Sequence, residues 1–477
     1  MKLSTQQQAV VEAVAANVCD IEVTARAGCG KTTTILAACG PAKGRVGFVA
    51  FNKAIAKELG QKAPPHVKVQ TLHALGAACL SAALGYRPEL DPDKVYLLAK
   101  NRMGKDTKDL MSPLIKLVGL CKNNLTNPID DNLADLAYSF DIDLPDEPAA
   151  LFDYVREVLT DCIPVQGQSA VIDFDDMIWL PVVMRVKNVP QYDWLFVDEA
   201  QDLNRTQMEL IRMVSKKGHI CYVGDPAQAI YGFRGADSMA MTTLKESLRE
   251  EGRMVAELQL TKTRRCPQKI VELAKKYVPD FEALPEAPEG MLSERTGENF
   301  QAGPGDMVLC RVNAPLVPIA YSFIRAGVPV KIQGRDIGAG LVSLVEKLKA
   351  TNIDELGEKL AKYQEKELRK LALQYKDKPS KLATAEVALR DKVDTLALLA
   401  AEQNTIEELL GSIARIFGDM TNSGGVVLLS SIHKAKGLES DRVIWIIPPK
   451  PFYGEQEKNL QYVAITRAKR ELIIHYQ

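Results

Sequence analysis

The stretch Ala25-Arg26-Ala27-Gly28-Cys29-Gly30-Lys31-Thr32 constrains this 477-residue chain more than any other. A short run of β-forming residues, 21–24, precedes it, and a segment with helical character, 33–39, follows. A strand, a glycine-rich turn and Gly-Lys-Thr opening a helix form a phosphate-binding P-loop, in which backbone N–H groups and the positive helix end face phosphate oxygens. The first glycine of the usual pattern is Ala25 here, so an incidental surface turn stays an open alternative at this point.

The P-loop reading assigns roles to particular residues. Lys31 is expected to reach the β- and γ-phosphates, and the Thr32 hydroxyl to ligate Mg²⁺. The nucleotide-binding residues predicted from this stretch are Ala27, Gly28, Cys29, Gly30, Lys31, Thr32 and Thr33.

Composition fits a soluble globular protein of several domains. Hydrophobic residues make up 46% and charged residues 25% of the chain, and the net charge is −1. Any nucleic-acid surface must therefore be a local patch. The nine cysteines include no C-x-x-C pair, which argues against a zinc site or a disulfide framework. No signal peptide and no apolar run near about 18 residues is visible, so we expect no membrane partner and a cytoplasmic location, or the host-cell cytoplasm if the chain is phage-encoded.

Strands alternate with helices along the first part of the chain, which predicts a parallel α/β sheet. Ligands bind such sheets at the carboxyl ends of the strands. Asn52, Lys53, Thr71 and His73 all come just after a predicted strand, at 46–51 or 67–69. A helix cap or a solvated polar residue is the alternative for each of them.

A second carboxyl end carries two adjacent carboxylates, Asp198 and Glu199, after the apolar run 194–197. This is a Walker B arrangement, in which Asp198 would hold Mg²⁺ and Glu199 would orient or deprotonate the attacking water. Gln228 follows the next strand, on the predicted γ-phosphate side. The segment after it offers two aromatic rings and a cation suited to a single strand of nucleic acid, Tyr231, Phe233 and Arg234, although packing of either ring in a core stays open.

Composition shifts predict four parts. Residues 1–76 and 169–258 form an ATP-binding domain with a helical insertion at 77–168, whose candidate basic face is Lys100, Arg102, Lys105, Lys108, Lys116 and Lys122. An ordinary solvated helix surface is the alternative for that face. Residues 259–340 and 421–477 form a second α/β domain, and 341–420 a helical insertion interpreted as a solvated arm.

The opening helix is expected to be capped by Ser4 or Thr5 and to keep its helical spacing of apolar residues through Val18.

Further motifs occur in a fixed order, and together they resemble the superfamily 1 helicases of the UvrD/Rep type. The sequence of the motif Val49-Ala50-Phe51-Asn52-Lys53 is most similar to the F-box DNA helicase and phage-type branch. The other motifs that carry the resemblance are Thr71-Leu72-His73, 197–202, 224–228, 230–236, 431–439 and 462–468.

The resemblance implies two RecA-like P-loop NTPase domains with mainly helical insertions. It also implies ATP and Mg²⁺ as cofactors and 3′→5′ movement on single-stranded DNA. Gln7 is then expected to contact adenine, Gln228 to sense the γ-phosphate, Arg265 and Arg467 to act as arginine fingers, and Glu439 to lie near the sugar. The DNA-binding residues implied are Phe51, Asn52, Thr71, His73, Tyr231, Phe233, Arg234 and His433. Implied partners are single-stranded DNA, junctions of single- and double-stranded DNA, and replication or repair proteins; a monomer is expected.

The sequence departs from the family at several positions. Arg26 stands where the P-loop usually has Gly, Arg264 where a Tyr commonly stacks on adenine, Phe233 where a Trp is usual and Ser440 where a Phe is usual. The second insertion is much shorter than in the large bacterial members. The alternatives are therefore a translocase that mainly strips bound proteins, an inactive nucleic-acid clamp, against which Lys31, Glu199 and Arg467 argue, and RNA as the track.

Overall fold

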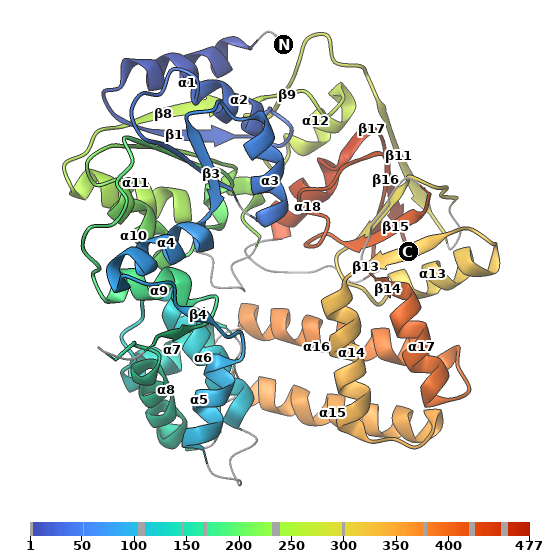
Figure 1. The fold of residues 1–477 in the computed structure, drawn as a ribbon. Helices are drawn as coiled ribbons and strands as arrows, with labels where there is room; N and C mark the ends of the chain where they lie inside the picture. The colour runs from blue at the N-terminus through green and yellow to red at the C-terminus, as the bar shows by residue number, and fades with distance from the viewer. Residues whose placement is uncertain are drawn as a thin grey trace. The chain divides into compact units, whose positions relative to one another are not determined.

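The computed structural model describes residues 3–477 except 51, 104–109, 141, 143, 146, 166–168, 231–238, 298–300, 375–378, 419–424 and 450–456. The chain divides into two compact units, Met1–Leu260 and Thr261–Gln477. Each unit contains its own parallel sheet with helices packed against it (Figure 1). All nine cysteines are free thiols, and eight of them are buried.

The sheet of the first unit has six parallel strands in the order β3-β2-β6-β7-β1-β8. Most of their residues are buried, because helices cover both faces. The strands are β1 (Asp20–Ala25), β2 (Val46–Ala50), β3 (Val67–Thr71), β6 (Trp194–Val197), β7 (His219–Gly224) and β8 (Val255–Leu260).

One face of this sheet packs against α4, α9, α10 and α11 in a single apolar cluster, and Figure 1 shows α1 and α2 on the opposite side. The helices and short 3₁₀ turns are α1 (Thr5–Ala16), α2 (Lys31–Ala38), α3 (Lys53–Lys62), α4 (Leu72–Leu84), α9 (Asp176–Val183), η2 (Ala200–Asp202), α10 (Arg205–Val214), η3 (Pro226–Gln228) and α11 (Ala240–Glu250). Ser4 caps α1 as expected. The expectation that Val18 continues this helix is wrong, because Asn17 turns left-handed (φ 57°) and ends it, leaving Val18 61% exposed.

The segment between β3 and β6 forms a mainly helical subdomain with an apolar core of its own. Its elements are β4 (Glu89–Leu90), α5 (Lys94–Arg102), α6 (Met111–Asn124), α7 (Asp130–Ser139), α8 (Ala149–Asp161) and β5 (Val171–Ile172). The basic-face prediction is wrong for Lys122, which is fully buried with its Nζ 2.6 Å from Asp173 and 2.8 Å from Asp176. Lys105 and Lys108 lie outside the described residues.

The second unit has a seven-stranded parallel sheet in the order β11-β17-β16-β12-β15-β13-β14. Its strands, with the short pair β9 and β10, are β9 (Lys262–Thr263), β10 (Glu282–Ala283), β11 (Met291–Thr296), β12 (Met307–Cys310), β13 (Val330–Gln333), β14 (Phe417–Gly418), β15 (Val427–Ser431), β16 (Ser440–Ile447) and β17 (Ala468–Tyr476). Its helices are α12 (Gln268–Ala274), α13 (Leu316–Arg325), α14 (Arg335–Leu348), α15 (Ile353–Gln374), α16 (Pro379–Ala401), α17 (Ile406–Ile416) and α18 (Glu457–Ile465).

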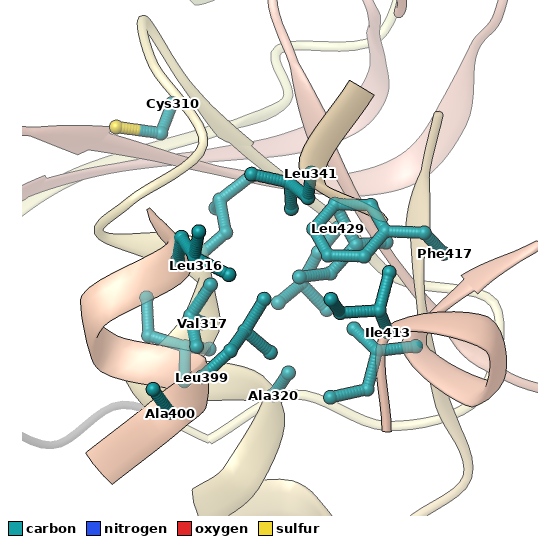
Figure 2. Close-up of a cluster of buried hydrophobic side chains, with 14 of the residues drawn as sticks. Cys310, Leu316, Val317, Ala320, Leu341, Leu399, Ala400, Ile413, Phe417 and Leu429 are labelled. Atoms are coloured by element: carbon teal, nitrogen blue, oxygen red, sulfur yellow. The ribbon is translucent and has the colours of Figure 1, made fainter. Parts of the chain in front are cut away.

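The helices α14 to α17 pack onto this second sheet. Figure 2 shows Leu341 of α14, Leu399 of α16 and Ile413 of α17 meeting Leu316 and Leu429 in one buried cluster. The interpretation of residues 341–420 as a solvated arm is therefore wrong for these helices, because their leucine and isoleucine faces complete the core of the unit. No helix in the described part of the chain is long and apolar enough to cross a membrane.

Candidate nucleotide-binding site

The glycine-rich loop has the backbone of a phosphate cradle. It leaves β1 at Ala25 and enters α2 at Lys31. Gly28 and Gly30 adopt left-handed φ angles of 69° and 82°, which side chains disfavour and which turn successive N–H groups toward one side of the loop. Thr32 and Thr33 are exposed in the first turn of α2. An anion placed there would meet the positive end of the helix.

Gln7 lies against this loop and is almost completely buried. Its Oε1 accepts a hydrogen bond from the Ser4 backbone at 3.0 Å, and its Nε2 donates to Thr34 Oγ1 at 3.1 Å. A Cβ on Gly30 would come within 2.9 Å of Gln7 Nε2, so a side chain at this position would displace the end of the glutamine. The amide therefore ties the start of α1 to the P-loop, while its contact with adenine stays a prediction.

The carboxylates at the end of β6 face the P-loop lysine. Lys31 Nζ lies 2.9 Å from the Glu199 carboxylate. Burial alone lowers the pKa of Lys31, but the charges of Glu199, Asp198 and Asp225 outweigh it, so the pKa is raised and the ammonium stays protonated. Burial, reinforced by the Glu199 charge, raises the pKa of Asp198 to about 6. A cation between Asp198 and phosphate oxygens would favour the ionised carboxylate and so lower the pKa of Asp198 again.

The residues present fit a magnesium ion held mainly by nucleotide. Among the described residues, no group of three or more His, Cys, Asp or Glu side chains is arranged to hold a metal by itself. Mg²⁺ in nucleotide enzymes commonly takes one or two protein oxygens and completes its shell with phosphate and water. Asp198, directly after β6, and the Thr32 hydroxyl, in the first turn of α2, would supply such oxygens. When bound, the ion would neutralise charge on the transferring phosphoryl group.

The strand order brings a third carboxyl end to this site, because β7 lies between β6 and β1. Asp225, directly after β7, is fully buried and accepts a hydrogen bond from Gln228 Nε2 at 2.7 Å. Gln201 bridges the two strand ends: its Nε2 donates to Glu199, and its Oε1 accepts from the Asp225 N–H at 3.0 Å. Sequence reasoning missed Gln201 and Asp225 as site residues, although both belong to the motifs it singled out.

Within the second unit, Arg265 and Glu439 form an ion pair at 2.6 Å. Arg265 also donates to the Thr466 carbonyl at 3.3 Å, next to Arg467. Arg467 is almost completely buried and donates to the carbonyls of Val463 and Leu438, each at 3.0 Å. Arg264 is exposed. The structure thus gathers Arg265, Glu439 and Arg467 at one place, while their roles toward nucleotide stay predictions.

Three of the DNA-binding residues predicted for the first unit, Asn52, Thr71 and His73, lie at one edge of its sheet. Asn52 caps α3 by accepting from the Ile55 N–H at 2.8 Å, and Thr71 caps α4 by accepting from the Ala74 N–H at 3.2 Å. Both residues therefore act as helix caps, which is the structural role given above as the alternative to ligand binding. His73 is half-buried in the first turn of α4, where burial lowers its pKa. Since β2 and β3 are parallel neighbours, these side chains share one sheet edge.

The remaining predicted DNA contacts are distributed differently. His433 is half-buried in the turn between β15 and β16 of the second unit. Phe51, Tyr231, Phe233 and Arg234 lie outside the described residues.

Comparison with known protein families decides the assignment. The UvrD/REP helicase N-terminal domain matches residues 3–249, and the UvrD-like helicase C-terminal domain matches residues 427–475. The chain belongs to the UvrD/REP helicase family. The resemblance inferred from the ordered motifs is confirmed, and the two parallel sheets with their helical insertions are the helicase fold expected for it.

Individual relatives are DNA helicases. ATP-dependent DNA helicase Rep of Escherichia coli (strain K12) is 29% identical over 282 residues, which cover 52% of this chain and 39% of Rep. F-box DNA helicase protein 1 of Schizosaccharomyces pombe is 24% identical over 528 residues, covering 99% of this chain and 57% of that protein. ATP-dependent DNA helicase PcrA of Staphylococcus aureus (strain Mu50) is 26% identical over 201 residues, 35% of this chain and 27% of PcrA. The chain thus spans less than two thirds of these relatives.

Proposed function

We propose that this UvrD-like helicase hydrolyses ATP to translocate 3′→5′ on single-stranded DNA and to separate duplex strands. The observation that carries the proposal is the convergence of Lys31, Asp198 and Glu199 at the carboxyl ends of one parallel sheet. An exposed P-loop threonine and an acid pair beside a lysine form an arrangement suited to in-line attack of water on a γ-phosphate.

Each residue has one task in this proposal. Lys31 and the loop N–H groups bind the phosphates, and Thr32 and Asp198 hold Mg²⁺. Glu199 takes or orients the proton of the attacking water. Arg265 and Arg467 of the second unit offset charge on the γ-phosphoryl group. Single-stranded DNA would contact Asn52, Thr71, His73 and His433, among other residues, and ATP cleavage would drive its movement.

Strand displacement tests the polarity and the activity together. Two duplexes of identical sequence carry a single-stranded tail on either the 3′ or the 5′ end of the loading strand. We expect ATP- and Mg²⁺-dependent unwinding of the 3′-tailed duplex and little of the 5′-tailed one. Preference for the 5′ tail would overturn the polarity, and failure on both tails despite ATP hydrolysis would overturn strand separation.

Displacement of bound proteins is the second candidate activity. It is favoured by the packing of α14, α16 and α17 into the core of the second unit, since those helices are then committed to the fold. Release of streptavidin from a biotinylated single strand, measured beside unwinding, separates the two activities. Robust unwinding of a bare duplex removes this candidate, and measurable turnover removes an inactive clamp. We propose single-stranded DNA and its junctions with duplex as the substrate and a monomer as the active form.

A further inference from the structure

Arg26 is the P-loop residue that departs from the usual glycine, and its side chain is engaged inside the first unit. Its backbone N–H donates to the Leu260 carbonyl at 2.9 Å, which anchors this end of the loop on β8. Its guanidinium nitrogen lies 2.9 Å from Asp225 Oδ1, and only 15% of the Arg26 side chain is exposed. The loop therefore makes an ion pair with the segment that follows β7.

Asp225 connects the Arg26 ion pair to other residues of the site. Its carboxylate is fully buried and holds the η3 turn by accepting from the Ala227 N–H at 3.2 Å and from Gln228 Nε2 at 2.7 Å. A buried carboxylate needs a compensating charge or several donors, and Arg26 supplies the positive charge. The position of Gln228 thus depends on a carboxylate that the P-loop itself neutralises.

The same contacts continue to the catalytic carboxylate. The Asp225 N–H donates to Gln201, and Gln201 donates to Glu199. Glu199 in turn pairs with Lys31 at 2.9 Å. Arg26 and Lys31 stand at opposite ends of one short loop, so the polar contacts close a ring that starts and finishes in the P-loop. A ring of this kind restrains each member more than a single contact would.

We propose that Arg26 is a positioning residue, which holds Asp225 and through it fixes Gln228 and Glu199 for attack of water on the γ-phosphate. The inference rests on the proposed function and adds to it a residue that acts through another residue. A glycine at this position offers no side chain for the task. Lys31 and the loop N–H groups still grip the phosphates without Arg26, so the expected effect falls on turnover and hardly on ATP binding.

A double-mutant cycle on DNA-stimulated ATP hydrolysis tests the inference. The variants are Arg26→Gln, Asp225→Asn and the pair combined, which removes both charges and leaves no buried carboxylate unpaired. We expect each single variant to lower kcat roughly 10- to 100-fold with a nearly unchanged KM for ATP, as small misplacements of catalytic groups do. The combined variant should lose no more than the worse single one, because the two residues act as a unit.

Two further readouts complete the design. Arg26→Lys, which keeps the charge, should recover part of kcat, and thermal unfolding of each variant separates misfolding from misplacement. Losses that multiply in the combined variant, or a large rise in the KM for ATP, would overturn the inference, since Arg26 would then act on nucleotide or DNA directly. A wild-type protein without DNA-stimulated hydrolysis would overturn the proposed function and this inference with it, whereas multiplying losses in an active protein overturn the inference alone.

Discussion

The ammonium group of Lys31 lies 2.9 Å from the carboxylate of Glu199, a residue 168 positions away in the sequence. The strand order β6-β7-β1 creates this contact, because it places the carboxyl ends that carry the two residues on one edge of the sheet. Phosphate oxygens would compete with Glu199 for Lys31. Binding of nucleotide would then free the Glu199 carboxylate for the attacking water.

Replacement of Glu199 by Gln should separate binding from hydrolysis. The amide removes a negative charge that competes for Lys31, so ATP should bind at least as tightly as to the wild type. Hydrolysis should fall by about 100- to 10,000-fold, the usual contribution of general-base catalysis. Equilibrium binding of a fluorescent ATP analogue and single-turnover hydrolysis measure the two effects. Glu209→Gln, at a partly exposed position of α10 where Glu209 pairs with Arg212, is the matched control and should hydrolyse ATP as the wild type does. Rapid turnover by Glu199→Gln would contradict the assignment.

The two candidate arginine fingers should respond differently to truncation. Arg467→Ala leaves the buried carbonyls of Val463 and Leu438 without their donor, so we expect the free energy of unfolding to fall by about 3 kcal/mol. Arg265 is more exposed and pairs with Glu439, so Arg265→Ala should change stability little while lowering kcat. Chemical denaturation and steady-state ATPase assays on both variants check this. Wild-type stability of Arg467→Ala would show that the contacts of Arg467 are unimportant to the fold.

Asn52 has a structural role that can be separated from its predicted contact with DNA. Asn52→Ala removes the cap of α3 and should cost about 1 kcal/mol, whereas serine is itself a good cap. Asn52→Ser should therefore keep the stability of the wild type. If Asn52 contacts DNA, both variants should bind single-stranded DNA more weakly, as measured by fluorescence anisotropy. A wild-type affinity in Asn52→Ser would limit this residue to capping.

Asp175 predicts a pH-dependent stability. Burial, with the negative charge of Asp173, raises its pKa to about 6, against the opposing charge of Lys122. The folded state therefore holds this proton more tightly than the unfolded state, and stability is lost as pH rises from about 4 through 6. Asp175→Asn should raise the free energy of unfolding by up to about 3 kcal/mol near pH 8 and by almost nothing near pH 4. Urea titrations at both pH values test this, and a pH-independent gain would refute it.

Local patterns predicted the parts of the site that local chemistry determines. The turn before Lys31 could be predicted because Gly28 and Gly30 favour it through their own backbone preferences. The carboxylates after β6 could be predicted because they directly follow an apolar strand. The contact of Arg26 with Asp225 spans 199 positions and depends on which strands are neighbours, so no local signal carries it. The sequence predicted that Ser4 or Thr5 caps α1, but it did not predict that Gln7 would lie against the P-loop.

Two of the wrong expectations share one physical cause, tertiary contact overriding a local pattern, whereas the expectation for Val18 failed because Asn17 ends the helix locally. The sequence pattern assigns Lys122 to the candidate basic face, yet Lys122 is buried because Asp173 and Asp176 neutralise its charge. The charge-rich helices after Leu341 read as an arm, yet their apolar faces fill the core that Leu316 and Leu429 also line. The sheet against which a helix packs determines which face of that helix becomes buried.

The central claim is that the Lys31, Asp198 and Glu199 site hydrolyses ATP in response to a DNA strand. The most direct measurement is the steady-state ATPase rate of the wild-type protein titrated with single-stranded DNA, beside Lys31→Ala and the exposed loop control Lys43→Ala. The account predicts a strong, saturable stimulation in the wild type and in Lys43→Ala, and its loss in Lys31→Ala. A wild-type rate indifferent to DNA, or full stimulation in Lys31→Ala, would contradict it.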